Sequence, residues 1–243
     1  MIQETRSKLK TLQLNGLLRA WDSLVETGAD KQRTIDELMA YLVDAECEGR
    51  YVRKVERNIT GAHFRLRATL EEFDCSTGRG IDRLAIARLA ECEWVRKAQN
   101  IIITGATGTG KSFLACALGH LACVREHNVL YHSSSKLLRA FRESQLDHSF
   151  VRLLKNIARH RVLILDDFGL EPIGTEERRW LLELIEDRYN IGSTIITSQF
   201  PTSLWPEIIG DPTIADAIID RLIHNVQVIE LIKEQTSRRA RHG

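Results

Sequence analysis

The chain has 243 residues, 43% of them hydrophobic, which is enough for one large domain or a small domain beside a medium one. Its 34 lysines and arginines almost balance 33 acids, so bulk charge gives no signal for nucleic acid and only local clusters remain to be considered. The five cysteines have neither disulfide nor zinc spacing, and no apolar run approaches the roughly 20 residues of a membrane helix, so we expect a cytoplasmic protein without a membrane partner.

The first 75 residues predict helices only. Apolar residues from Leu14 to Val25 recur at helical spacing, and Gly16 could interrupt that helix. Residues 34–37, Thr-Ile-Asp-Glu, form a capping box that opens a second helix, which the pattern extends towards Ile59. The stretch 71–80, with its two glycines, has the composition of a linker. We therefore predict a helical domain over 1–75 and a second domain over 76–243.

A basic stripe follows the end of this second helix. Between residues 50 and 67, six basic residues accompany the single acid Glu56, and the first four lie on one helical face. Guanidinium groups at this spacing can follow a phosphate backbone, although a solvated helix face explains the same pattern. The candidate DNA-binding residues of the stripe are Arg50, Arg53, Lys54, Arg57, Arg65 and Arg67.

After a helix predicted near 81–96, the chain carries a glycine-rich loop. The β-branched run 100–104 predicts a buried parallel strand, and residues 105–112 complete the Walker A pattern G-x-x-x-x-G-K-[ST] before a helix. Such a loop points backbone N–H groups at phosphate oxygens, its lysine reaches the β- and γ-phosphates, and its serine ligates Mg²⁺. A glycine turn that binds nothing is the alternative. The predicted ATP-binding residues are Gly105, Ala106, Thr107, Gly108, Thr109, Gly110, Lys111, Ser112 and Phe113.

A strand over 128–132 and helices over 135–144 and 149–159 come next. Seven basic residues and two acids lie between residues 136 and 161, so this segment could touch DNA on the inner wall of a ring or spiral. The candidates at its start are Lys136, Arg139 and Arg142.

The run 162–167 is four apolar residues followed by two carboxylates, the Walker B pattern of a buried strand that delivers acids to a crevice. We expect Asp166 to hold Mg²⁺ and Asp167, where glutamate is usual, to orient or deprotonate the attacking water. The alternative is a pair that only caps the strand end. Because the 128–132 strand separates loop and acids along the chain, we expect one strand inserted between theirs in the sheet, unlike the adjacent strands of nucleotide kinases and GTPases.

The remaining pattern alternates helix and strand: a helix over 176–190, a strand over 193–197, a helix over 213–224 and a strand over 226–231. Strands separated by helices imply a parallel sheet covered on both faces. The predicted fold class is therefore α/β, with a five-stranded parallel sheet between helices and a small helical domain before it.

This arrangement resembles the AAA+ ATPases, and four segments narrow the resemblance to the IstB-like transposition helper ATPases, relatives of the DnaC helicase loader and the DnaA initiator. The segments are LILDDFGL at 163–170, TSQFP at 197–201 with Trp205, AIIDRL at 217–222 followed by His224 and Asn225, and LKTLQLNGLLRA at 9–20. The resemblance covers nearly the whole chain.

The resemblance implies three further site residues. Gln199 occupies the sensor-1 position, where the family usually has asparagine. Arg221 matches the arginine finger that reaches the neighbouring subunit's γ-phosphate; its alternative is a helix-surface arginine paired with Asp216 or Asp220. Arg238 matches a sensor-2 arginine in a motif one residue longer than usual, and a solvated tail is its alternative.

The residues predict an ATPase that holds ATP and Mg²⁺, and the resemblance implies that it oligomerises head to tail on duplex DNA and recruits or activates a transposase in the bacterial cytosol. Its predicted catalytic residues are Asp167, Lys111, Gln199, Arg221 and Arg238. The main alternative is a DnaC-like replicative helicase loader. A small-molecule kinase and a DNA-binding module with ATP as a structural ligand are the alternatives from other classes.

Overall fold

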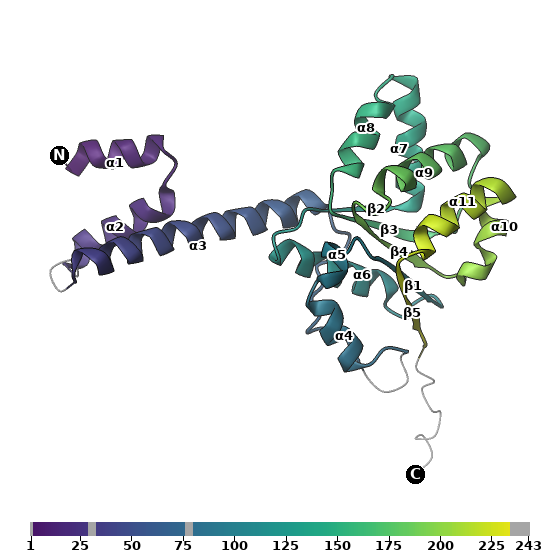
Figure 1. Ribbon diagram of the computed structural model, residues 1–243, viewed down its shortest axis with the longest axis horizontal. Coiled ribbons are helices and arrows are strands. Elements are labelled where there is room, and N and C mark those ends of the chain that lie inside the picture. The colour runs from purple at the N-terminus through teal and green to yellow at the C-terminus, as the bar shows by residue number, and fades with distance from the viewer. Residues whose placement is uncertain (1, 29–32, 76–79, 234–243) are drawn as a thin grey trace, which may run out of the picture. The chain divides into compact units, whose positions relative to one another are not determined.

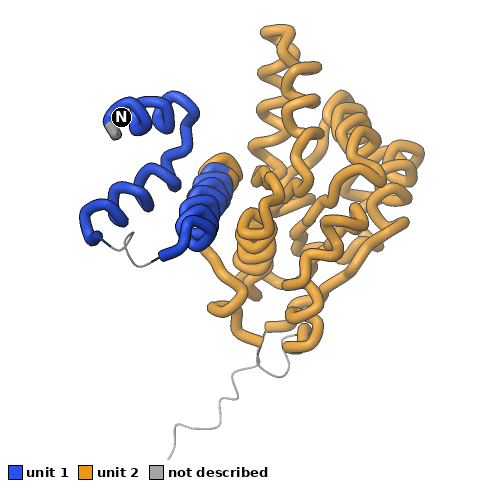
Figure 2. The backbone as a smooth tube through the Cα atoms, turned by 60° about the vertical axis from the view of Figure 1, so that its left-hand side comes forward, with its two compact units in different colours: residues 1–57 blue, residues 58–243 orange. Residues whose placement is uncertain are grey.

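The computed structural model describes residues 2–28, 33–75 and 80–233, and the chain divides into two compact units, Met1–Arg57 and Asn58–Gly243 (Figures 1 and 2). This division differs from the boundary near residue 75 that composition suggested. Residues 58–75 belong to the second unit because Ala62, Ala68 and Phe73 are buried in its core. Residues 76–79 of the expected linker lie outside the described residues. Within the described ranges, no helix is both long and apolar enough to cross a membrane.

The first unit consists of α1 (Ile2–Thr11), α2 (Asn15–Thr27) and most of α3 (Ile35–Ala62). Gly16 does not break α2: a Cβ at this position would lie 2.4 Å from the carbonyl oxygen of Ala45, so glycine permits α2 and α3 to approach closely. The capping box is confirmed, because the Thr34 N–H donates to Glu37 at 2.7 Å and the Glu37 N–H donates to the Thr34 hydroxyl at 3.3 Å.

A buried carboxylate joins the same two helices. Glu46 of α3 accepts hydrogen bonds from the N–H groups of Gly16 at 2.7 Å and Leu17 at 3.2 Å, which α2 leaves without partners in its first turn. Although burial alone raises the pKa of Glu46, its hydrogen bonds with Arg50 and with these two amides bring that pKa below its usual value. Glu46 is therefore an ionised cap of α2 supplied by another helix.

The second unit contains the predicted parallel sheet of five strands, in the order β2-β3-β4-β1-β5. The strands are β1 (Asn100–Gly105), β2 (Val129–Ser133), β3 (Val162–Phe168), β4 (Ser193–Ser198) and β5 (Val226–Leu231). One strand does lie between those of the loop and the acids, but it is β4 rather than the expected 128–132 strand. Ile195 of β4 pairs with Ile101 of β1 on one side and with Ile164 of β3 on the other. β4 suits this central position because it is buried along its whole length, whereas β2 forms an edge.

Helices cover both faces of the sheet (Figure 1). Ile101 and Ile103 of β1 join one core cluster, with α6, whereas Ile102 joins another, with α7, α8, α9 and α11. The helix predicted near 81–96 is two helices, because Cys92 takes a positive φ of 56° between them. The helices of this unit after α3 are α4 (Arg83–Ala90), α5 (Glu93–Arg96), α6 (Lys111–Val124), α7 (Ser134–Leu146), α8 (Phe150–Ala158), α9 (Thr175–Arg188), α10 (Trp205–Ile209) and α11 (Pro212–Ile223).

Candidate functional site

The glycine-rich loop connects β1 to α6 in a conformation that only glycines adopt readily. Gly105, Gly108 and Gly110 have φ values of 145°, 80° and 92°. A Cβ on Gly105 would lie 2.2 Å from the carbonyl oxygen of Leu231 in β5, so no larger residue fits there. The first N–H groups of α6, which begins at Lys111, have no acceptors within the helix, and their partial positive charge faces the loop. Loop and helix start thus form a cradle suited to phosphate.

Lys111 folds back into this cradle. Its buried Nζ donates to the carbonyl oxygens of Gly105 at 2.8 Å and Ala106 at 2.9 Å. Burial lowers the pKa of Lys111 from its usual range, while the carboxylates of Asp167 and Asp166 oppose that shift. The ammonium group is therefore held by two neutral oxygens that phosphate oxygens can replace.

Asp166 is fully buried at the carboxyl end of β3, where side chains from three other elements converge on it. It accepts hydrogen bonds from Ser112 Oγ at 2.8 Å, Thr197 Oγ1 at 2.6 Å and the Tyr131 hydroxyl at 2.6 Å. Burial and the hydrogen bond to Asp166 raise the pKa of Tyr131, which keeps this phenol a donor. Ser112 and Asp166, brought together as predicted, are hard oxygen ligands of the kind that Mg²⁺ prefers.

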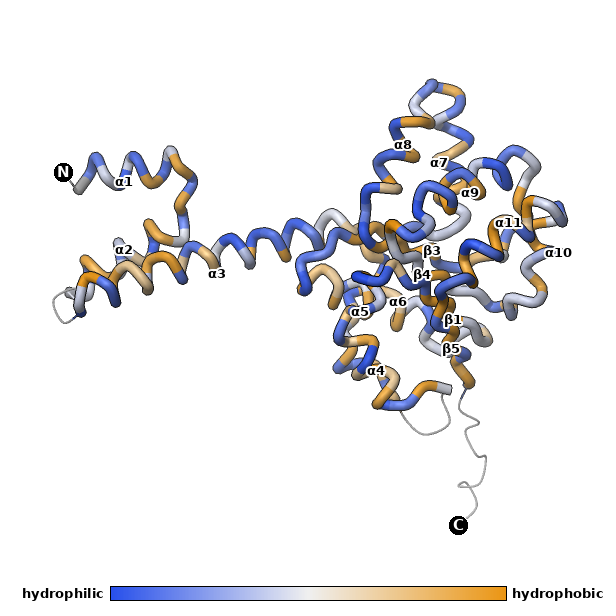
Figure 3. Tube along the Cα trace, viewed as in Figure 1, coloured by the Kyte–Doolittle hydropathy of each residue, from blue (hydrophilic) through white to orange (hydrophobic). Residues whose placement is uncertain are grey.

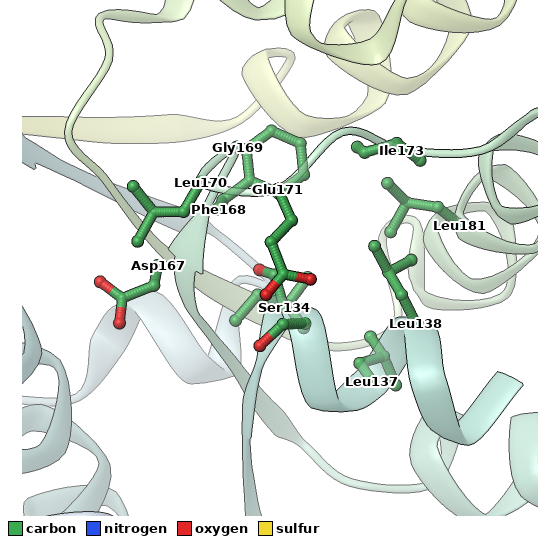
Figure 4. A pocket seen from close by; sticks show the side chains of 12 residues that line it. Ser134, Leu137, Leu138, Asp167, Phe168, Gly169, Leu170, Glu171, Ile173 and Leu181 are labelled. Atoms are coloured by element: carbon green, nitrogen blue, oxygen red, sulfur yellow. The ribbon is translucent and has the colours of Figure 1, made fainter.

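Asp167 differs from its neighbour because the backbone turns at this residue. Its φ is 60°, its N–H donates to Thr197 Oγ1 at 2.9 Å, and the pairing of β3 with β4 shifts register between Leu165 and Phe168. The Asp167 side chain is 30% exposed, whereas that of Asp166 is 0% exposed. Figure 4 shows Asp167 at one side of a pocket that Leu138 and Leu181 also line. One acid is therefore buried in the protein and the other is partly exposed to solvent.

Gln199, the residue directly after β4, lies against the loop. Its Oε1 accepts a hydrogen bond from Thr107 Oγ1 at 2.9 Å. Two other predicted ATP-binding residues contact the protein itself. Thr109 donates to the carbonyl oxygen of Ala106 at 2.9 Å, and the ring of Phe113, on α6, stacks on Phe73 at a centroid distance of 6.3 Å.

Arg221 lies on α11 and contacts α9 rather than the loop of its own chain. Its Nη2 lies 2.7 Å from Glu186 Oε1, and its Nη1 donates to the carbonyl oxygen of Ala217 at 2.8 Å. The acid that pairs with it is thus Glu186, not Asp216 or Asp220. The other predicted arginine, Arg238, lies outside the described residues.

The candidate DNA-binding residues fall into different environments. Arg50 and Arg53 pair with Glu46 at 2.7 and 3.4 Å, and Arg57 is exposed on the predominantly hydrophilic later part of α3 (Figure 3). On α7, Lys136 and Arg139 are exposed, while Arg142 pairs with Glu177 at 2.9 Å. The exposed members keep the properties that phosphate contact requires.

Arg65 does not continue the stripe of α3. The helix ends at Ala62, and Arg65 Nη1 lies 3.2 Å from Asp167 Oδ2 and 3.7 Å from Asp166 Oδ2. Arg67, two residues further, is exposed.

Sequence reasoning missed Tyr131 and Thr197. Both lie near the carboxyl ends of strands, and those ends meet at one edge of a parallel sheet, so polar side chains there were a usable signal. Arg65 gave no comparable signal, because it was grouped with the basic residues that precede it in the chain.

Comparison with known proteins agrees with this geometry. Residues 7–243 match the family model of IstB-like ATP binding proteins. The insertion sequence ATP-binding protein y4pL of Sinorhizobium fredii is 41% identical, over 98% of this chain and 97% of its own length.

Two solved structures show the fold. The DnaC helicase loader superposes with a TM-score of 0.57 at 18% identity, covering 68% of this chain and 96% of the loader chain. AMPPCP-bound DnaA from Aquifex aeolicus has a TM-score of 0.58 at 22% identity, covering 70% of this chain and 51% of that chain. The sheet and its helices thus form an AAA+ P-loop ATPase fold. By its match over 7–243, the chain belongs to the family of IstB-like ATP-binding proteins associated with insertion sequences.

Proposed function

We propose that this protein hydrolyses ATP to ADP and phosphate and uses the ATP-bound state to assemble on duplex DNA as a transposition helper. The observation that carries the hydrolytic part is the 2.8 Å hydrogen bond between Ser112 Oγ and Asp166 Oδ1, since it joins the start of α6 to the acid strand. Glycine cradle, lysine and two carboxylates thereby lie close together, as phosphoryl transfer requires.

Each side chain has a distinct role in this proposal. Lys111 exchanges its two loop carbonyls for phosphate oxygens, and Ser112 and Asp166 hold Mg²⁺. Bound Mg²⁺ neutralises the charge that develops on the phosphates. Asp167, on the crevice side, orients the attacking water or takes its proton, and Gln199 positions the same water from the end of β4.

Oligomerisation completes the site. The Arg221 side chain is only 29% exposed and pairs with Glu186 of its own chain. It must therefore leave Glu186 before it can contact a phosphate group. We propose that a head-to-tail neighbour offers that partner, the γ-phosphate of its ATP, and that Arg238 contributes as a sensor-2 residue. Hydrolysis then depends on assembly.

Duplex DNA is the proposed template for this assembly, through Arg50, Arg53, Lys54 and Arg57 of α3 and the basic residues at the start of α7. Phosphate contacts of this kind are independent of sequence and weaken with salt. A transposase is the proposed protein partner because relatives such as y4pL are insertion sequence proteins. A helicase-loading role is the second candidate, suggested by the DnaC likeness, which concerns the fold alone.

Steady-state phosphate release, with and without duplex DNA, tests the proposal. We expect slow release by the protein alone and faster release with DNA at low salt. Tight ATP binding without release in either condition would leave ATP as a structural ligand and contradict the proposed hydrolysis.

A further inference from the structure

Arg65 lies at the centre of the proposed metal and hydrolysis site, although neither its position in the chain nor the known motifs assign it there. Its Nη1 is within 4 Å of both acids, at 3.2 Å from Asp167 Oδ2 and 3.7 Å from Asp166 Oδ2. Hydrogen bonding to Tyr131 and attraction to both carboxylates raise the pKa of Arg65, so its guanidinium is always charged.

The backbone that carries this guanidinium is fixed. On one side of Arg65, Phe64 packs on α6 so closely that a Cβ at Gly119 would lie 2.7 Å from its ring. On the other side, Ala68 is buried in the core, as is Ala62 at the end of α3. Arg65 is thus held over α6, which begins directly at the glycine loop.

The side chain itself is accessible to solvent. It is 58% exposed, and an ion pair so accessible to water is only weakly stabilising, so the guanidinium can leave the acids without unfolding its segment. Its departure would leave two adjacent carboxylates without this positive charge, and a cation bound there would replace it.

A divalent cation held by Ser112 and Asp166 would lie next to the present position of this guanidinium. Both positive charges would then lie beside Asp166, which is fully buried and near which water screens charges less, so the guanidinium and the metal would repel each other. Arg65 and the metal therefore compete for the same acids.

We propose that Arg65 is a positioning residue of the ATP site, a resident cation that holds Asp166 and Asp167 together in the metal-free site and that Mg²⁺ must displace. This inference rests on the proposed metal site. Arg65 would then set the Mg²⁺ concentration at which the site binds ATP together with the metal. In this proposal the DNA contacts are made by the arginines of α3.

The test measures binding of a fluorescent, non-hydrolysable ATP analogue while Mg²⁺ is titrated. We expect Arg65→Ala to lower the Mg²⁺ concentration at half-saturation about three- to tenfold, and Arg65→Lys, which keeps the charge, to stay closer to the wild type. Arg67→Ala is the matched control and should not shift the midpoint.

Each other result overturns the proposal in a recognisable way. An unchanged or raised Mg²⁺ midpoint in Arg65→Ala, with a clear Mg²⁺ effect in the wild type, would remove the role of Arg65 and leave the metal site standing. No Mg²⁺ effect in the wild type would remove the metal site and the role of Arg65 with it. An unchanged midpoint with DNA affinity reduced as far as in Arg57→Ala would assign Arg65 to DNA instead.

Discussion

The carboxyl edge of the sheet and the basic face of α3 are both rich in charged and polar side chains, but they hold them in opposite ways. At the sheet edge, Asp166 is fully buried and accepts three side-chain hydrogen bonds from three elements. On α3, Arg57 is exposed, and Arg50 shares one acid with Arg53. Buried polar networks lose much when one member is removed, whereas exposed charges act additively.

We therefore expect single substitutions at the sheet edge to abolish ATP binding or hydrolysis. Single substitutions on α3 should weaken DNA binding only in part. Lys111→Ala should have the broadest effect, because ATP binding precedes every later step: we expect ATP affinity to fall at least about 100-fold, since Lys111 supplies the ammonium group that lies against the loop carbonyls. Equilibrium binding of a fluorescent ATP analogue measures it. Lys8→Ala, at an exposed position of α1, is the control and should bind normally. Tight binding by Lys111→Ala would refute the cradle.

Arg221→Ala should reduce DNA-stimulated hydrolysis by about 10³-fold or more if it acts as an arginine finger. Because the finger serves a neighbour, mixing this variant with Lys111→Ala should restore part of the activity. Phosphate release across a series of mixing ratios measures the recovery. Zero recovery at every ratio would place Arg221 outside the shared site, as a surface partner of Glu186.

Asp167→Asn should bind ATP like the wild type but turn over about 10²–10⁴-fold more slowly, because the amide cannot take a proton from water. A pair of measurements is needed: analogue affinity and single-turnover hydrolysis. Asp187→Asn, at an exposed position of α9, is the control. Normal turnover in Asp167→Asn would show that the carboxylate on the crevice side is not used.

Within the first unit, Glu46 differs from the other charged residues of α3, because it is a buried acid that pairs with Arg50 and Arg53. Glu46→Ala leaves the amides of Gly16 and Leu17 without acceptors, so their hydrogen exchange should speed up by about 5- to 150-fold, equivalent to about 1–3 kcal/mol. Glu46→Gln keeps an acceptor and should lose less.

The protection of these two amides against hydrogen exchange should decrease as the pH falls. The pKa of folded Glu46 is lowered, so its carboxylate stabilises the unit fully above the unfolded value of about 4.3 and loses that contribution as the pH falls through the lower folded value. A protection factor at Gly16 that does not fall with acid would contradict an ionised cap.

The smallest effect is expected for Arg57→Ala. It should weaken duplex binding a few-fold at low salt and reduce the slope of log affinity against log salt by about one, equally for all sequences. Anisotropy of a labelled duplex at several salt concentrations provides both numbers. An unchanged slope would mean that this face of α3 is only solvated.

The fold and half of the site were predictable because short motifs and strand patterns are local. The 105–112 loop and the acids at the end of β3 were recognisable, and the predicted five-stranded parallel sheet is confirmed. The order of the strands in the sheet was harder to predict from the sequence. β2 is the first strand after the loop but lies at the edge of the sheet, whereas β4 comes later in the chain and lies between β1 and β3.

Arg65 escaped prediction for a related reason. The prediction grouped Arg65 with the basic residues of α3, but α3 ends at Ala62, and the following segment brings Arg65 to an acid 102 positions away in the chain. No periodicity in the sequence encodes such a contact. Tyr131 and Thr197, in contrast, lie at the ends of predicted strands and were within reach of the strand-edge rule.

Electron paramagnetic resonance with Mn²⁺ in place of Mg²⁺ tests whether loop and acid strand share one metal site, because it counts bound metal beside a non-hydrolysable ATP analogue. We expect one Mn²⁺ per chain, coupled to the phosphorus of the analogue, with affinity lowered at least about tenfold by Ser112→Ala and by Asp166→Asn. Unchanged Mn²⁺ affinity in both variants would contradict a single site shared by the glycine loop and the acid strand.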